Sequence, residues 1–128
     1  MILLDTHTWL WAATAPHYLS AKASETIADA QQVAISVVSC WEAAVAIRRG
    51  RLRVEHDARQ WMLDVLRQHR IDVLPLSLNI AVAAGSFARE LHGDPIDRVL
   101  VATAMAYDCP LITKDQKLRA FAPLTTIW

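Results

Sequence analysis

Four separate segments of this chain each have a carboxylate where an apolar run gives way to a predicted helix, or where a predicted helix begins. The carboxylates are Asp5, Glu42, the pair Asp94 and Asp97, and Asp115. Open parallel sheets bind their ligands at the carboxyl ends of the strands, so we expect these acids to gather in one site. Like charges gathered in this way repel one another unless a cation lies among them.

Mg²⁺ or Mn²⁺ is the cation that such an all-oxygen site favours, because hard ions bind carboxylates and keep water in their remaining positions. Zinc is disfavoured, since the histidines lack the spacing of zinc ligands. A hard cation binds phosphate oxygens, activates water and stabilises the charge that develops in phosphodiester hydrolysis. The chain has only three glycines and no Ser-His-Asp, Cys-His or phosphate-cradling motif that would support another mechanism.

Each acid also has a purely structural interpretation at a helix start. Ser39 and Glu42 have the spacing of a capping box, in which serine and glutamate each bond a first-turn amide. Asp94 has the position of an N-cap, and Asp97 that of a first-turn acid that favours the helix dipole. The other two acids are also placed to cap helices. Independent caps have no reason to lie at one edge of a sheet, so their joint placement favours a shared site.

The elements that would position these acids follow from the apolar patterns. Continuous apolar runs predict buried strands at residues 1–4, 33–38, 71–74 and 111–113, with a weaker strand at 125–127. A 3.6-residue period predicts a helix over residues 58–69, with Asp57 as its N-cap. Further helices are predicted to begin near Thr6, Ser20, Ser39, Ser77 and Asp94, and helix ends are predicted at Gly50 and Gly93. Strands that alternate with helices predict a parallel sheet covered by helices on both faces.

Composition fits one domain spanning residues 1–128, with 54% hydrophobic residues, enough for a single large core. Thirteen lysines and arginines offset thirteen acids, so no global charge attracts nucleic acid. RNA binding would therefore need a local basic patch. The candidates for this patch are Arg48, Arg49, Arg51, Arg53, Lys114 and Lys117, and ordinary solvated charges are the alternative for each.

The two cysteines, Cys40 and Cys109, have no C-x-x-C or histidine partner, so we interpret them as reduced core thiols. Reduced thiols fit a cytoplasmic protein. The apolar start is interrupted at Asp5 and lacks a basic segment, so we expect neither a signal peptide nor a membrane-spanning segment. Trp41 and Trp61 lie on apolar helical faces, where core packing is expected.

Several segments resemble a known family, and they occur in its order. They are residues 1–11, which begin Met1-Ile2-Leu3-Leu4-Asp5-Thr6-His7; Ser36-x-x-Ser39-x-Trp41-Glu42; residues 92–104, which begin His92-Gly93-Asp94-Pro95-Ile96-Asp97-Arg98; and Leu111-Ile112-Thr113-x-Asp115. Together they resemble the PIN-domain ribonucleases, specifically the VapC-type toxins of bacterial type II toxin–antitoxin pairs. The resemblance implies a three-layer α/β/α sandwich with a central, mainly parallel sheet of four to five strands. It also implies Mg²⁺- or Mn²⁺-dependent endonucleolytic cleavage of RNA, by one ion or two.

The resemblance also assigns roles to single residues. It implies that the catalytic and metal-binding acids are Asp5, Glu42, Asp97 and Asp115, while Asp94 is either part of the metal shell or an N-cap. The polar positions that orient the site are Thr6, His7, Ser39 and Thr113, and Arg98 would hold a carboxylate or a phosphate. His7 and His92 belong to the motifs of this subgroup, where hydrogen bonding is favoured over metal ligation.

Family resemblance further implies a homodimer, an RNA substrate and a cognate antitoxin whose tail occupies the acidic groove, with no membrane partner. Trp9, Trp11 and Trp128 are either core residues or part of a surface for a second copy or the antitoxin. Two rival functions stay open: a PIN-like nuclease that acts in RNA processing or on structured DNA, and a non-catalytic interaction module whose acids are only caps.

Overall fold

The computed structural model describes all residues, Met1 to Trp128. Five strands form one sheet in which every neighbouring pair is parallel. They are β1 (Ile2–Leu4), β2 (Val33–Ser36), β3 (Ile71–Leu74), β4 (Leu111–Ile112) and β5 (Thr126–Ile127). The order across the sheet is β3-β2-β1-β4-β5. Strands β2 and β3 therefore lie on one side of β1, and the later strands β4 and β5 lie on its other side. The carboxyl ends of β1 and β4 therefore flank a topological switch point, where open α/β sheets bind ligands.

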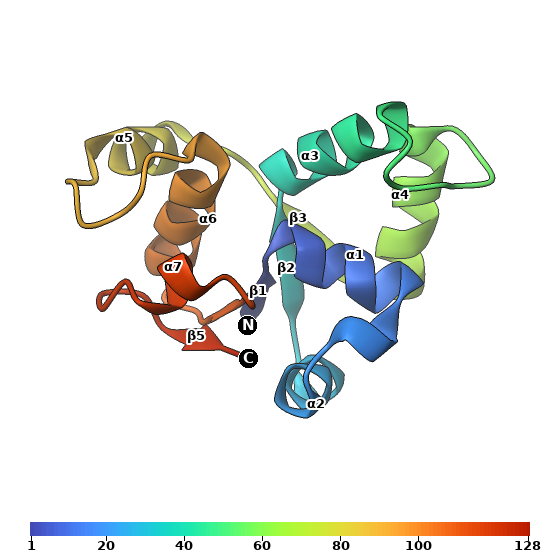
Figure 1. Ribbon diagram of the computed structural model, residues 1–128, viewed down its shortest axis with the longest axis horizontal. Coiled ribbons are helices and arrows are strands. Elements are labelled where there is room, and N and C mark those ends of the chain that lie inside the picture. The colour runs from blue at the N-terminus through green and yellow to red at the C-terminus, as the bar shows by residue number, and fades with distance from the viewer.

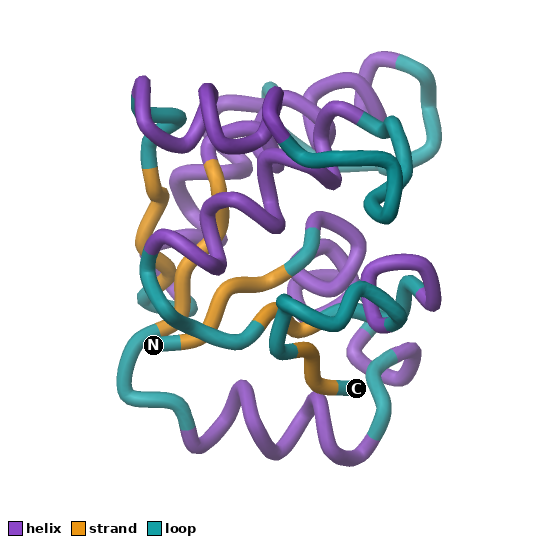
Figure 2. The backbone as a smooth tube through the Cα atoms, turned by 90° about the vertical axis from the view of Figure 1, so that its left-hand side faces the viewer, coloured by secondary structure: helices purple, strands orange, loops and turns teal.

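Helices connect the strands and surround them (Figures 1 and 2). They are α1 (Thr6–Thr14), the 3₁₀ helix η1 (Pro16–Tyr18), α2 (Ala21–Asp29), α3 (Val37–Arg48), α4 (Ala58–Gln68), α5 (Leu78–Ser86), α6 (Pro95–Ala106) and α7 (Gln116–Arg119). The predicted caps of α2, α4, α5 and α6 are confirmed, because the side chains of Ser20, Asp57, Ser77 and Asp94 each accept from a first-turn amide. None of the helices combines the length and the apolar character needed to span a lipid bilayer.

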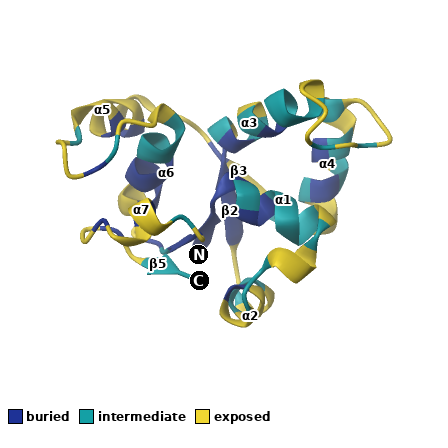
Figure 3. Cartoon of the chain, in the orientation of Figure 1, coloured by how far each residue is buried: buried dark blue, intermediate teal, exposed yellow.

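The sheet separates two hydrophobic cores, which confirms the three-layer α/β/α architecture. Side chains of a strand alternate between its faces, so Leu3 packs with residues of α6 and α7 while Ile2 and Leu4 pack with residues of α1 to α4. The buried strands lie between the two groups of helices (Figure 3). This placement explains why β1, β2 and β4 are buried and almost continuously apolar. The edge strand β3 was also predicted to be buried, but it contains Asp72 and only Leu74 is buried in it.

Two helix boundaries differ from the sequence prediction. Helix α3 begins at Val37 rather than near Ser39, and its N-cap is Ser36, whose hydroxyl accepts from the amide of Val38 at 3.3 Å. The capping-box interpretation of Ser39 and Glu42 is therefore wrong, since both residues lie inside the helix. Gly50 follows the end of α3 with a φ of 73°, as predicted for a helix end. Gly93, however, lies in the connection before α6, because α5 already ends at Ser86.

The tryptophans also divide differently from the prediction. Trp41, expected in the core, is 61% exposed, whereas Trp9 is fully buried. Trp61 is partly buried against the core that contains Trp9, and their rings lie 6.1 Å apart. Trp11 and Trp128 are half-buried, with ring centroids 6.0 Å apart. Both cysteines are free thiols, one buried and one half-buried.

Candidate active site

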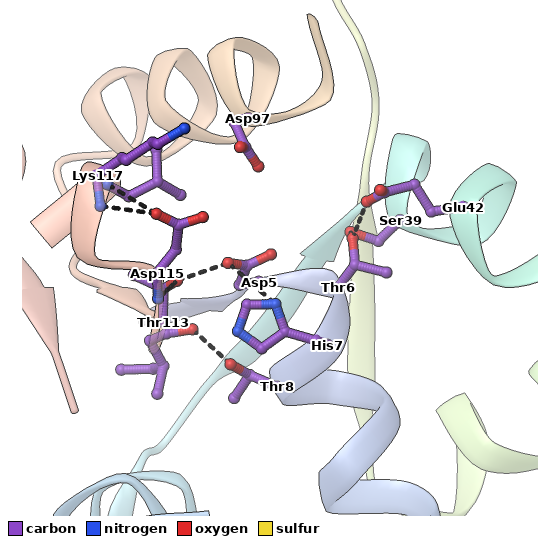
Figure 4. Close-up of polar contacts among 12 residues, drawn as sticks. Asp5, Thr6, His7, Thr8, Ser39, Glu42, Asp97, Thr113, Asp115 and Lys117 are labelled. Atoms are coloured by element: carbon purple, nitrogen blue, oxygen red, sulfur yellow. Dashed lines mark hydrogen bonds and ion pairs between the residues drawn. The ribbon is translucent and has the colours of Figure 1, made fainter. Parts of the chain in front are cut away.

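Asp5 is oriented by the strand next to its own. It has the N-cap position of α1, yet its side chain makes no capping hydrogen bond. Instead Oδ2 accepts from the Thr113 hydroxyl at 2.6 Å, across the switch point between β1 and β4 (Figure 4). The Nδ1 atom of His7 lies 3.5 Å from the same oxygen. Asp5 is only 4% exposed, and burying a carboxylate costs free energy. A role as a helix cap alone does not explain why a carboxylate is buried here.

The Thr113 hydroxyl also connects Asp5 to Asp115. Its oxygen accepts from the amide of Asp115 at 3.0 Å while its proton goes to Asp5. Asp115 in turn caps α7, accepting from the amides of Lys117 and Leu118 at 2.8 and 3.2 Å. Asp115 therefore both caps α7 and belongs to the acidic site.

Glu42 is positioned by Thr6 and Ser39, from two helices. The Thr6 hydroxyl lies 2.8 Å from that of Ser39 and also bonds the Glu42 carboxylate. Since a hydroxyl has a single proton, Thr6 donates to Glu42 and accepts from Ser39. This chain links the first turn of α1 to α3, and directs Glu42 toward the side of the site opposite Asp115 (Figure 4).

The start of α6 supplies the remaining acids. The Asp94 carboxylate accepts from the amide of Asp97 at 3.0 Å, as predicted for an N-cap. Asp97 extends from the first turn of α6 toward the space above Asp5 (Figure 4). The Nε2 atom of His92 lies 3.2 Å from Asp97 Oδ2, and its Nδ1 accepts from the amide of Asp94 at 3.3 Å. His92 therefore contacts both acids of this segment.

These acids line one cleft of about 590 Å³ between α1, α3 and the start of α6. The structure thus brings together all five predicted carboxylates, which are Asp5, Glu42, Asp94, Asp97 and Asp115. Arg49 and Arg51 line the same cleft, and of the other basic candidates Lys117 lines an adjoining hollow. A separate apolar cavity of about 370 Å³, lined by Trp9 among others, contains no carboxylate and has no part in this chemistry.

Burial and mutual repulsion raise the pKa values of three of these acids, Asp97, Asp5 and Glu42. Burial, followed by the charges of the other four cleft acids, raises the pKa of Asp97 to about 7. Burial is also the largest cause that raises the pKa of Asp5, partly offset by His7 and by the Thr113 hydrogen bond. It raises the pKa of Glu42 as well, with opposition from the Thr6 hydrogen bond. No lysine or arginine forms an ion pair with these acids.

The carboxylates interact electrostatically without converging on a single point. No three His, Cys, Asp or Glu side chains lie close enough together to ligate one metal ion in this arrangement. The cleft nevertheless gathers five acids that no lysine or arginine pairs, and every acidic oxygen there is of the type that Mg²⁺ binds.

Arg98 has a different place from the one expected. Its guanidinium donates to backbone carbonyls: from Nε to Ala84 at 2.9 Å, from one terminal nitrogen to Leu91 at 3.3 Å, and from the other to Phe87. The interpretation of Arg98 as a ligand of a carboxylate or phosphate is therefore corrected. This side chain fastens the end of α5 and the following loop to α6.

Sequence reasoning missed Trp41 as a cleft residue. It lies directly before Glu42 and lines the cleft, whereas the inward stripe of α3 contains Ser39, Ala43 and Ile47. These residues recur every four positions once the helix starts at Val37. The spacing was readable in the sequence, but it required Ser36 rather than Ser39 as the cap.

Comparison with known proteins agrees with this geometry. The family described as PIN domain matches residues 2–123. The ribonuclease VapC22 of Mycobacterium tuberculosis is 31% identical over 119 residues, which are 93% of this chain and 90% of that protein. Among solved structures, a toxin–antitoxin complex from Klebsiella pneumoniae matches with a TM-score of 0.71 and 20% identity, covering 100% of this chain and 97% of that one. VapBC2 from Rickettsia felis, bound to a DNA fragment from its promoter, matches with a TM-score of 0.71 and 18% identity over 99% and 98% of the two chains. The structural matches concern the fold, and with the extent of the two sequence matches they lead to one conclusion: the chain belongs to the PIN-domain family and is a relative of its VapC ribonucleases.

Proposed function

We propose that this protein is a metal-dependent endoribonuclease and the toxin of a toxin–antitoxin pair. The observation that carries the proposal is the set of five carboxylates in one cleft at the switch point, with no lysine or arginine paired to them. The relative named as a ribonuclease supports RNA as the substrate. The similar folds in toxin–antitoxin complexes support an antitoxin as the partner.

The donor atoms of the cleft have the chemistry that suits a divalent cation. A pKa of about 7 for Asp97 means that burial and, after it, the neighbouring acids oppose its ionisation, and a cation among these acids would oppose both effects. The donors are carboxylate oxygens, which suit Mg²⁺ or Mn²⁺. Asp5, Glu42, Asp97 and Asp115 would hold the ion or ions, with Asp94 at the margin.

The side chains around these acids fix the carboxylates before substrate binds. Thr113 orients Asp5, and the chain from Ser39 through Thr6 orients Glu42. A bound cation would neutralise charge on the scissile phosphate and lower the pKa of a water molecule. Water attacks the phosphorus, the bond to the 3′-oxygen breaks, and that oxygen takes up a proton. The products are a 5′-phosphate and a 3′-hydroxyl.

The test is RNA cleavage by Asp5→Asn and Asp97→Asn with Mg²⁺ or Mn²⁺, next to thermal melting without metal. We expect cleavage to be abolished while metal-free stability is held or rises, because removing a charge relieves repulsion. Asp64→Asn is the matched control, since Asp64 is paired with Arg67 outside the cleft. A loss of stability with unchanged cleavage would contradict the catalytic proposal and favour an interaction module.

Expression of the chain alone tests its role as a toxin. We expect growth arrest that depends on Asp5, and recovery when the cognate small partner is co-expressed. Indifference of growth to expression would favour a nuclease of RNA processing. Sequencing RNA ends after a brief pulse of expression would identify the substrate.

We also place the protein in the cytoplasm, because both cysteines are free thiols.

A further inference from the structure

Trp41 is the most exposed tryptophan of the molecule, and nothing in the fold accounts for its exposure. Its side chain is 61% exposed, although tryptophan has more apolar surface to bury than any other residue. The other four tryptophans pair with one another, Trp9 with Trp61 and Trp11 with Trp128. Trp41 packs against no other aromatic ring, so its faces are available to a ligand.

The position of Trp41 connects it to the acidic cleft. It precedes Glu42 on α3, and Glu42 is fixed to the floor of the cleft through Thr6. Trp41, Val45 and Arg49 recur every fourth residue and all line the cleft, so one face of α3 forms its wall. This wall passes from an aromatic ring through an apolar side chain to a cation.

Two positively charged side chains lie at this wall of the cleft. Arg49 and Arg51 line the cleft and form no ion pair with any carboxylate of the chain. An aromatic ring beside unpaired cations is the combination with which proteins bind single-stranded nucleic acid, by base stacking and by contact with phosphates.

We propose that Trp41 stacks on an unpaired nucleobase of single-stranded RNA next to the scissile phosphate, and that Arg49 and Arg51 contact the phosphates that follow. The inference rests on the proposed function for the identity of the nucleic acid. It implies that the cleft selects unstacked, single-stranded segments, since a base within a duplex has no free face for the indole. Stacking alone confers little sequence preference, because every base has an aromatic face.

A second protein chain is the competing occupant of this wall. The arginines argue for RNA, since they complement phosphates that approach the carboxylates through a cation. The most exposed large apolar side chain is Leu78, on α5, which does not line the cleft. Self-association therefore has a better surface elsewhere on the molecule.

The test compares Trp41→Leu with Trp41→Phe, which keeps an aromatic face. Tyr18→Leu is the matched control, because Tyr18 is 58% exposed and does not line the cleft. The first measurement is equilibrium binding of a short fluorescent single-stranded RNA, with Ca²⁺ as a hard cation and also with a chelator. We expect Trp41→Leu to weaken binding about tenfold, with most of the affinity kept by Trp41→Phe and all of it by Tyr18→Leu. A duplex of the same sequence should bind equally to wild type and Trp41→Leu.

A series of RNAs with one abasic nucleotide at successive positions locates the stacked base. Wild type should lose affinity at one position beside the cleavage site, and Trp41→Leu should show no loss there. In cleavage assays Trp41→Leu should raise KM and leave kcat nearly unchanged, whereas Asp5→Asn abolishes kcat.

Identical abasic profiles for wild type and Trp41→Leu would overturn the inference. So would an unchanged RNA affinity accompanied by a changed oligomeric state or antitoxin affinity, which would identify protein as the occupant. If wild type cleaves no RNA, the proposed function fails, and the binding measurements alone still decide whether Trp41 stacks on a base.

Discussion

Thr113 determines the orientation of two acids with one hydroxyl group. It accepts from the amide of Asp115 and donates to Asp5, and it is completely buried. The two acids belong to different strands, whose carboxyl ends flank the switch point. A small polar side chain thus sets the floor of the cleft, and its loss would affect both sides.

Replacement of Thr113 tests this role. Thr113→Val keeps the shape but removes the hydroxyl, so Asp5 loses its hydrogen-bond donor and the Asp115 amide loses its acceptor. We expect a loss of about 1–3 kcal/mol in the free energy of unfolding, measured in urea. Cleavage should fall roughly 10- to 100-fold, as for residues that orient metal ligands. Thr113→Ser should recover most of both losses, and equal behaviour of the two variants would contradict the hydroxyl's role.

Asp97 makes metal-free stability depend on pH. Its pKa is near 3.8 in the unfolded chain and about 7 in the folded protein. Between these values the folded state binds the extra proton, so stability is full below the lower value and falls as pH rises toward the upper one. With a chelator, we expect a lower melting temperature at about pH 7.5 than at about pH 5, and a smaller difference in Asp97→Asn. The same pH slope in this variant and in the Asp64→Asn control would contradict the assignment.

Arg98 couples two elements rather than binding a ligand. Its donors bond carbonyls of α5 and of the loop that leads to α6, while its neighbours on α6 supply acids to the cleft. The guanidinium also lies 5.8 Å from the Phe87 ring. The Arg98 side chain therefore helps to hold the loop before α6, and through it positions Asp94 and Asp97 indirectly.

Arg98→Met should show this coupling. It keeps much of the apolar stem but leaves several carbonyls without their donor, so we expect a loss of about 3 kcal/mol in the free energy of unfolding. Hydrogen exchange should accelerate over residues 87–93, with less change in β1 and β2. Arg98→Lys should recover only part of the stability, because an ammonium does not reproduce the planar fork. Unchanged exchange in the loop would exclude this role.

At the scale of the molecule, two of the most exposed apolar side chains lie on one helix. Leu78 and Val82 are 80% and 58% exposed, and they lie one turn apart on α5. Neighbouring exposed apolar side chains of this size are typical of protein interfaces. The net charge is zero, so no long-range repulsion opposes association of two copies. The family resemblance implies that two copies of the chain associate, and we predict that they would contact each other through this face of α5.

Charge introduced on this face tests the dimer. Leu78→Glu combined with Val82→Glu should lower the solution mass measured by light scattering, because association would bury two carboxylates. The melting temperature of the monomer should change little, since both side chains are exposed. Leu63→Glu, on the exposed side of α4, is the control. A dimer that persists in the double variant would place the interface elsewhere.

The sequence by itself determined the strands, the parallel sheet and the set of acids. Buried strands such as β1 and β2 must be apolar on both faces, and helix caps such as Asp57 and Asp94 act within one turn. Both signals depend only on residues that are neighbours in the sequence, so they can be read without the tertiary structure. The acids at Asp5 and Asp115 could likewise be assigned to one edge, because the ends of parallel strands meet there.

Only the tertiary structure decided which groups the side chains contact. The bond between Thr113 and Asp5 joins residues 108 positions apart, and the carbonyls bound by Arg98 belong to another helix. The inward packing of Ser39, Ala43 and Ile47 sets the rotation of α3, and this rotation exposes Trp41 in the cleft instead of burying it. Such contacts depend on the register and rotation of packed elements. A rotation of a helix about its axis changes these contacts, while the hydrophobic pattern of the sequence stays the same.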